Sequence, residues 1–190
     1  MPSASLGIWQ SRRKVSLDEI EAAHTSVGGT GRGRRFATQQ INHAYVVLLS
    51  SQFQGFCRDL HSECGDFLVS AIGNATLEAL FLDELRRGRK LDQGNPNPGN
   101  IGTDFGRFGI TFWPEVLRAS SHSLARKNYL ETMNSWRNAI AHQDFSKVGG
   151  TGTVHLATIK QWRSSCNALA VTFDGVMKQH LLTATGRTPW

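Results

Sequence analysis

The fold follows first from residues 41–72, INHAYVVLLSSQFQGFCRDLHSECGDFLVSAI. Large apolar side chains recur there at steps of three and four, which places them on one face of an α-helix of about eight turns. Such a face must be buried against other helices, and Gly55 or Gly65 could bend the helix. The residues of this face are Ile41, Tyr45, Leu48, Leu49, Phe53, Phe56, Leu60, Cys64, Phe67, Leu68 and Ile72.

Further helical stretches follow along the chain. Residues 75–90 predict a second helix with basic side chains at its end, Pro114 begins a stretch that leads into a helix at 124–142, and residues 156–182 carry another long apolar face. The residues between, 93–109, are rich in Pro, Gly and Asn and predict a long loop that carries or covers a site. Strict alternation of apolar and polar residues is nearly absent. We therefore predict an all-α bundle of four to five helices, two of them long.

The N-terminal part predicts a separate basic arm. Its first 15 residues are expected to be loose, and a short helix follows at 16–27 with Ser16 as N-cap and Glu19 at the capping-box position. The stretch GGTGRGRR at 28–35 lacks the GK[ST] ending of a phosphate-binding loop and predicts a basic, flexible linker. The expected division of the chain is a basic, Gly-containing arm with a short helix at 1–35, a helical domain at 36–182 and a C-terminal tail at 183–190.

Composition indicates what kind of partner the protein binds. The 190 residues include 21 Lys and Arg against 15 Asp and Glu, and the resulting net charge of +6 suits an anionic partner such as nucleic acid. The longest apolar run, 44–49, is far shorter than the ~20 residues that span a bilayer. The first residues lack the apolar core of a secretory signal, and three cysteines, an odd number, argue against a disulfide framework. We therefore expect a cytoplasmic protein with no membrane partner.

Cys57, His61 and Cys64 are candidate metal ligands, because their spacing puts them on one face of the long helix. The two cysteines border the apolar face of that helix, and buried thiols behave as small hydrophobic groups. No fourth ligand lies nearby by spacing. We therefore predict no metal site at these residues.

The basic run Arg86, Arg87, Arg89 and Lys90 admits two interpretations. A cluster of this kind is often a solvated helix end, because cations are favoured at the negative end of the helix dipole. The alternative is a patch that binds RNA through phosphate groups, in which each phosphate neutralised would steepen the salt dependence of binding. The sequence leaves both open.

The most informative segment is residues 135–142, SWRNAIAH. Arg137 lies at the edge of the buried arc of its helix, where a guanidinium that cannot lose its charge needs an anion or other acceptors. A structural Arg–carboxylate pair would satisfy that need, and so would a bound phosphate. The arc itself is predicted from a turn of 100° per residue and consists of Tyr129, Leu130, Met133, Trp136 and Ile140.

His142 stands at the end of the same helix, on the more polar side with Asn134 and Asn138. An imidazole in that place can cap the helix, or can act as an acid or a base near neutral pH. Arg137 and His142 project about 140° apart on an ideal helix. They converge only if the last turn unwinds, if the Arg side chain reaches round, or if a second protomer contributes one of them.

The hexapeptide RNAIAH at 137–142 resembles the motif of the HEPN superfamily, in which an Arg is followed after four to six residues by a His, commonly with a polar residue directly after the Arg. Arg137, Asn138 and His142 match those three positions. The layout of long helices also resembles that of the RiboL-PSP type of HEPN domain over residues 36–182. Asp144 stands where the antitoxin-modified subgroup carries a Tyr, so modification at that position by a nucleotidyltransferase antitoxin is not expected.

The resemblance implies a metal-independent endoribonuclease without a cofactor, acting as a toxin or in phage defence. His142 would be the general acid or base, Arg137 would hold the scissile phosphate, and Asn138 would orient His142 or the phosphate. It also implies a homodimer whose two motifs share one cleft, and an antitoxin or regulatory protein as a possible partner. The alternative implied by the family is a non-catalytic module that binds RNA, a nucleotide or a protein. A third possibility is a toxin silenced by a partner that docks on the Gly-rich arm and the 93–109 loop.

Overall fold

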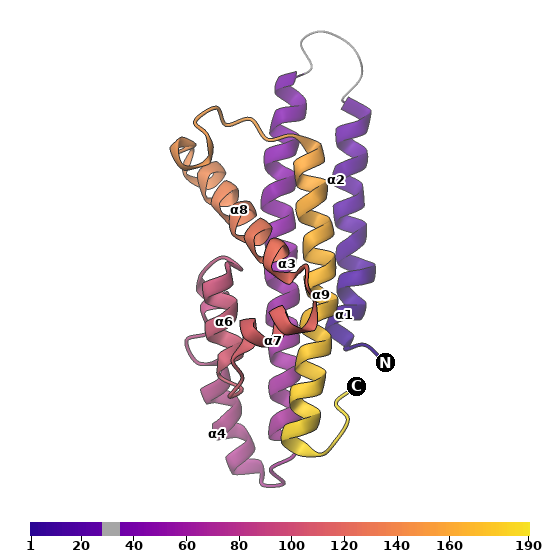
Figure 1. Ribbon diagram of the computed structural model, residues 1–190, viewed down its shortest axis with the longest axis vertical. Coiled ribbons are helices and arrows are strands. Elements are labelled where there is room, and N and C mark those ends of the chain that lie inside the picture. Colours follow the sequence, from indigo (N-terminus) through magenta and orange to yellow (C-terminus); the bar gives the residue numbers. More distant parts are fainter. Residues whose placement is uncertain (28–34) are drawn as a thin grey trace.

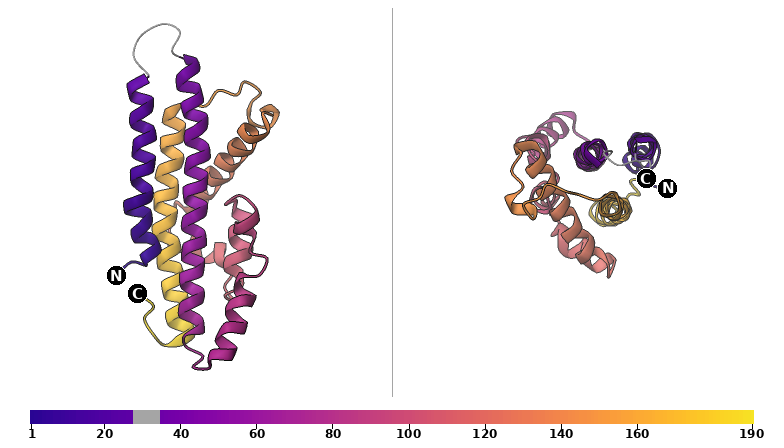
Figure 2. Two further views of the ribbon diagram at one scale, coloured as in Figure 1. Left: turned by 180° about the vertical axis from the view of Figure 1, so that it is seen from behind. Right: turned by 90° about the horizontal axis from the view of Figure 1, so that it is seen from above.

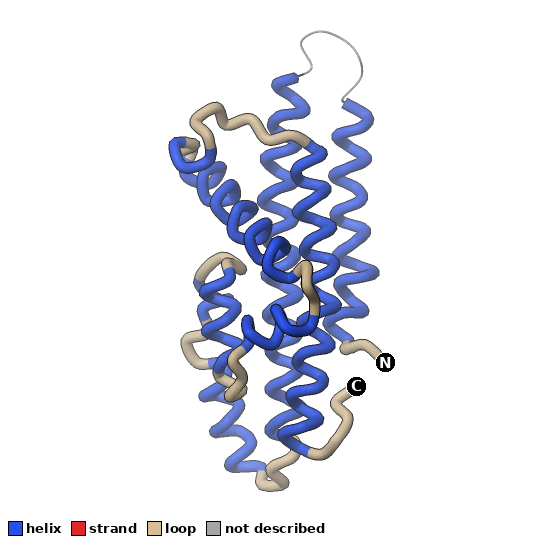
Figure 3. Tube along the Cα trace, viewed as in Figure 1, coloured by secondary structure: helices blue, strands red, loops and turns tan. Residues whose placement is uncertain are grey.

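The computed structural model describes residues 1–27 and 35–190, and all regular secondary structure in these ranges is helical (Figure 3). The longest helix, α3 (Arg35–Val69), runs the length of the molecule and packs against α2, α4, α8 and α9. Beside it runs α9 (Leu156–Thr185) (Figure 1). The prediction of an all-α bundle with two long helices is confirmed.

The core lies along the facing sides of α3 and α9. Spacing of three and four puts the large apolar side chains of both helices into it, as the sequence pattern predicts. The two ends of the predicted α3 face differ from the prediction, since Ile41 is not part of the core, and α3 stops at Val69, which leaves Ile72 exposed. The fully buried members include Tyr45, Leu49, Phe53, Phe56, Leu60, Ile159, Leu169, Phe173, Met177 and Leu181.

The N-terminal residues are not a loose arm, and this prediction is wrong. They form three helical segments that follow one another directly: α1 (Ala4–Ile8), the π-helix η1 (Trp9–Arg13) and α2 (Lys14–Val27). Leu6, Trp9 and Leu17 of these segments are buried in the common core. The N-cap is Ser3, whose hydroxyl accepts a hydrogen bond from the Leu6 amide at 3.0 Å. Ser16 therefore lies within α2 and caps nothing. Burial of these few apolar side chains against distant helices stabilises the segment.

The predicted linker at 28–35 lies outside the described residues except for Arg35, which begins α3. At the other end of the chain, α9 continues to Thr185, three residues past its predicted end. The two termini lie close together (Figure 2), and Asp174 of α9 joins them by accepting hydrogen bonds from the Ser3 amide at 3.0 Å and the Trp190 indole at 3.3 Å.

The middle of the chain is divided into shorter helices than the sequence predicts. Helix α4 (Ala75–Arg86) ends before Gly88, whose positive φ of 64° breaks the predicted 75–90 helix, and α5 (Lys90–Gln93) follows. The predicted loop at 93–109 contains α6 (Pro98–Gly106), which Asn97 caps. Helix α7 (Phe112–Ala119) begins two residues before Pro114. Caps and Pro near a helix start make such short helices possible inside a Gly-rich stretch.

Helix α8 (Ser123–His142) crosses α3 and α9 obliquely, and its last turn lies at the edge of the molecule (Figure 1). Its predicted inner arc is confirmed, with Leu130 and Met133 buried and the other three residues packed on the core. The helix ends at His142 because Gln143 adopts the left-handed conformation (φ 54°). The connection to α9 contains the 3-10 turn η2 (Ser146–Val148). Among the described residues, no helix combines the length and apolar character needed to cross a membrane.

Candidate active site

A hollow of about 360 Å³ opens where α8 ends. Ser135, Asn138, Ala139 and His142 line it from the helix, and the connection after the helix contributes Asp144 and Lys147. His142 and Asn138 lie one turn apart on α8, so both can present polar groups to one small ligand. The sequence predicts His142 and Asn138 for this site, but it does not identify Asp144 or Lys147.

The connection that carries Asp144 and Lys147 is held in place by Phe145. The Phe145 ring stacks on His43 of α3, with ring centroids 5.5 Å apart, and packs against Trp136 of α8. His43 Nε2 lies 2.8 Å from the Gly152 carbonyl at the far end of the connection. Aromatic stacking and this hydrogen bond anchor both ends of the turn. Lys147 lies on this anchored turn and lines the same hollow as His142.

Asp144 adds a negative charge at the rim of the hollow. Its Oδ1 accepts a hydrogen bond from the Ser146 amide at 3.0 Å. Hydrogen bonds from Ser146, together with the nearby charges of Lys147 and His142, hold the pKa of Asp144 below its usual value. The carboxylate is therefore ionised at neutral pH, and beside it Lys147 makes no ion pair within the described part of the chain.

Arg137 is half-buried, and no carboxylate in residues 1–27 and 35–190 forms an ion pair with it. Its Nη1 donates a hydrogen bond to Asn138 Oδ1 at 3.3 Å. The structural reading of Arg137 as one half of an Arg–carboxylate pair thus finds no partner in the described residues. A guanidinium that no carboxylate of the described residues neutralises is suited to bind an anion.

The structure does not bring Arg137 into the hollow that His142 lines. The angular separation predicted for an ideal helix persists, because α8 stays helical through His142. Asn138 links the two residues, since it lines the hollow and accepts the hydrogen bond from Arg137. A second donor reaches the same Asn138 oxygen from Asn95, which the sequence does not identify as a site residue.

Asn134 is buried, so its predicted place on the polar side of α8 is wrong. Its amide nitrogen donates to the Pro96 carbonyl at 3.1 Å, and its oxygen accepts from the Ser50 hydroxyl at 3.2 Å. The bond to Pro96 fastens this part of the 93–109 segment to α8. None of the described residues of that segment lines the hollow, and its packing over a site stays a prediction.

The basic run at the end of α4 does not present four free cations. Arg89 is a correction to the predicted RNA-binding set, because its side chain is only 10% exposed and is bonded to Asp92, the Ser62 hydroxyl and the Arg58 carbonyl. The other two arginines pair with carboxylates at the surface, while Lys90 is exposed. The surface partners are Asp66 for Arg86, and Asp83 and Glu84 for Arg87.

Cys57, His61 and Cys64 are all buried in the core. His61 Nε2 lies 3.2 Å from the Asp104 carbonyl and therefore donates to it. Burial, followed by the positive charge of Arg89, lowers the pKa of His61 to about 4, while burial raises the pKa of both thiols. The described residues contain no group of three His, Cys, Asp or Glu side chains arranged to hold a metal ion.

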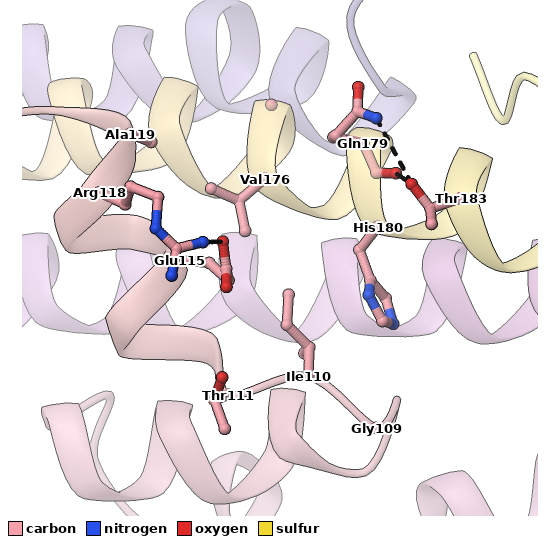
Figure 4. A pocket seen from close by; sticks show the side chains of 11 residues that line it. Gly109, Ile110, Thr111, Glu115, Arg118, Ala119, Val176, Gln179, His180 and Thr183 are labelled. Atoms are coloured by element: carbon pink, nitrogen blue, oxygen red, sulfur yellow. Dashed lines mark hydrogen bonds and ion pairs between the residues drawn. The ribbon is translucent and has the colours of Figure 1, made fainter.

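A second hollow, of about 490 Å³, lies between α7 and the C-terminal half of α9 (Figure 4). Its charged groups satisfy each other, because Arg118 Nη1 and Glu115 Oε2 form an ion pair at 2.5 Å. His180 Nε2 donates to the Phe108 carbonyl at 2.8 Å. None of the motif residues lines this hollow, so we assign the candidate site to the smaller one at the end of α8.

The model of the RiboL-PSP-HEPN family matches residues 11–179, which cover α2 to α8 and most of α9 and so include the whole hollow at His142. No curated protein and no solved structure matches the chain.

Proposed function

Since the chain belongs to the RiboL-PSP-HEPN family, we propose that it is a metal-independent endoribonuclease. RNA carries its own nucleophile, the 2′-OH, so the enzyme needs only proton transfer and stabilisation of a crowded anionic phosphorane. Attack on the adjacent phosphate forms one P–O bond and breaks the P–O5′ bond. The products are a 2′,3′-cyclic phosphate end and a 5′-OH end.

The observation that carries this proposal is the state of Arg137. A half-buried guanidinium without a carboxylate partner in the described chain is linked through Asn138 to a hollow lined by His142. An anionic phosphate would supply the charge that the protein does not. The hollow also holds Lys147, which adds a second cation for the RNA backbone.

The proposed roles follow from the groups available. His142 takes the proton of the 2′-OH or gives one to the leaving 5′ oxygen, as a neutral or protonated imidazole can. Arg137 binds the phosphate and stabilises the charge that develops on it. Asn138 orients these groups, and Arg86, Arg87 and Lys90 contact RNA further from the cut.

Two copies of the chain complete the site in this proposal. Arg137 lies outside the hollow of its own protomer, so a two-fold dimer that pairs the ends of two α8 helices would bring Arg137 of one copy to His142 of the other. The setting we propose is a toxin or phage-defence effector of the cytoplasm, regulated by an antitoxin or a similar protein partner.

The position of Arg137 outside the hollow also supports a second candidate, a non-catalytic module that binds RNA, a nucleotide or a protein. In that case the cations supply affinity and the His142 imidazole is dispensable. Toxicity on expression that disappears in His142→Ala would favour the enzyme, because binding alone does not depend on proton transfer.

The test is incubation of the purified chain with total cellular RNA in excess EDTA, followed by analysis of the new ends. We expect the wild type to leave cyclic phosphate ends, and His142→Ala to cut about 10²–10⁴-fold more slowly. The matched control is His155→Ala, which removes an exposed imidazole at the start of α9. Full activity in a folded His142→Ala protein would contradict the assigned role.

A further inference from the structure

The amide of Asn138 has an orientation that its neighbours determine. Arg137 Nη1 donates to Asn138 Oδ1 at 3.3 Å, and Asn95 Nδ2 donates to the same oxygen. A guanidinium carries only donors, so the amide must turn its oxygen toward Arg137. The amide nitrogen then faces away from both donors, and within the described ranges no residue accepts a hydrogen bond from it.

Asn95 is itself held firmly, although it lies in an irregular segment between α5 and α6. Its carbonyl accepts a hydrogen bond from Asn100 Nδ2 at 2.8 Å. The next residue, Pro96, is buried, and its carbonyl accepts from Asn134 on the motif helix at 3.1 Å. The backbone at Asn95 and Pro96 is therefore tied to α6 by Asn100 and to α8 by Asn134.

We propose that Asn95 is a positioning residue that holds the Asn138 amide nitrogen toward the hollow, where it donates a hydrogen bond to a non-bridging oxygen of the bound phosphate. This inference rests on the proposed ribonuclease function. Its physical content is the choice between the two orientations of one amide. With Arg137 and Asn95 both donating to the Asn138 oxygen, the amide turns its nitrogen, a donor, toward the phosphate, and with the amide reversed an oxygen would face the phosphate and repel it.

Asn95→Asp tests the idea with little change of shape, because a carboxylate can only accept and would draw the Asn138 nitrogen toward itself. Asn95→Ala removes the bond without adding charge. Asn128→Asp is the matched control, since it adds the same charge at an exposed position of α8. With a fluorescent RNA oligonucleotide in excess EDTA, we expect kcat to fall about 100-fold in Asn95→Asp and about tenfold in Asn95→Ala. KM should change less than about threefold, and the control should match the wild type.

A wild-type rate in Asn95→Asp, or a raised KM with unchanged kcat, would overturn the positioning role while leaving the ribonuclease intact. If the wild type itself fails to cut, the proposed function is what fails. In that case NMR reports the orientation of the Asn138 amide, a measurement that does not require cleavage activity. Nuclear Overhauser contacts between the Asn138 amide protons and the His142 ring, present in the wild type and lost in Asn95→Asp, would support the inference. Their absence in the wild type would overturn it.

Discussion

Arg137 and Arg163 are both partly buried, but their guanidinium groups have different partners. Arg163 is 12% exposed and is bonded to Asp18 at 2.5 Å, to Glu21 at 3.3 Å and to the Tyr45 hydroxyl at 3.1 Å. Within residues 1–27 and 35–190, the Arg137 side chain makes one hydrogen bond, to a neutral amide. A cation already neutralised by its own chain holds the fold together, whereas one that is not neutralised remains available to a ligand.

This contrast predicts the effect of Arg137→Lys, which keeps the charge but loses the planar fork that binds a phosphate through two hydrogen bonds. We expect cleavage to fall about 10–100-fold, and the free energy of unfolding to stay within about 0.5 kcal/mol of the wild type. The measurements are RNA cleavage in EDTA and urea unfolding. A stability loss as large as the activity loss would indicate a structural role for Arg137.

His61 shows the opposite case, a titratable side chain that the fold keeps neutral. Burial lowers its pKa to about 4 from an ordinary value of 6.5, and its ring packs between Phe105 and Phe108. As the pH falls below 6.5, His61 binds a proton in the unfolded chain, whereas in the folded chain it stays neutral until the pH approaches 4. Stability is therefore complete above pH 6.5 and is lost as the pH approaches 4.

The resulting prediction is that the wild type loses about 2 kcal/mol of unfolding free energy between pH 7 and pH 5. His61→Phe should remove most of this pH dependence, at the cost of the hydrogen bond to the Asp104 carbonyl. An exposed histidine changed in the same way, His155→Phe, should leave the dependence as it is. Urea unfolding at several pH values measures the pH dependence of the unfolding free energy. A His61→Phe variant as pH-sensitive as the wild type would contradict the role of His61.

At the scale of elements, the sequence suffices where one helix carries a continuous apolar face. The faces of α3, α8 and α9 repeat at steps of three and four and are buried as predicted. The N-terminal helices could not be predicted in this way, because the apolar side chains buried from their described residues are only Leu6, Trp9 and Leu17, and Trp9 packs on Phe53 and Phe56, far along the chain. Burial of a few side chains against existing helices outweighs a weak local pattern.

The candidate site likewise contains residues that the sequence identifies and residues that only the tertiary structure brings to it. His142 and Asn138 belong to a contiguous motif on one helix and can be found by reading it, as can Arg137. Asn95 reaches the site from a segment distant in sequence, and Lys147 reaches it through a turn that Phe145 anchors. Arg89 resembles a surface cation in sequence, but the fold surrounds it with acceptors from α3 and α5. Local patterns carry no information on such tertiary contacts.

The attachment of α2 to the bundle gives a prediction at this scale, since Arg163 of α9 ties both Asp18 and Glu21 of α2. Hydrogen bonds from Lys14 and Arg163 lower the pKa of Asp18. At Glu21, burial acts to raise the pKa, but Lys160, Tyr45 and Arg163 outweigh it and the pKa lies below its usual value. We expect Arg163→Met to lose about 1–3 kcal/mol at pH 7.

The sign of the pH effect follows from these lowered pKa values. The contribution is present above the ordinary values of 4.5 for Glu21 and 3.8 for Asp18, and disappears as the pH falls through the lower values of the folded state. The difference between wild type and Arg163→Met should therefore shrink below about pH 4. Lys14→Met, which removes an exposed pair with Asp18, should cost less than about 0.5 kcal/mol. Thermal unfolding across pH 3–7 measures this. A stability difference between wild type and Arg163→Met that stays constant with pH would contradict the ion-pair explanation.

At the scale of the whole molecule, one protomer does not assemble the proposed site. The end of α8 lies at the edge of the bundle (Figure 1), and Arg137 does not line the hollow that His142 lines. Helix α8 packs against α3 and α9, and Ala139 near its end is buried, so unwinding its last turns to bring the two residues together would cost buried contacts. A second copy can supply the guanidinium without that cost.

A composite site predicts that two inactive variants restore each other. In a heterodimer of Arg137→Ala and His142→Ala, one of the two sites keeps an intact Arg137 from one protomer and an intact His142 from the other. Random mixing of equal amounts makes half of the dimers heterodimers, so we expect about one quarter of the wild-type cleavage. Each variant alone should be inactive, and mixing must be done by joint refolding so that subunits exchange. Heterodimers detected by mass spectrometry but devoid of activity would place Arg137 and His142 of the same chain in one site, because then every heterodimer site lacks one of the two groups.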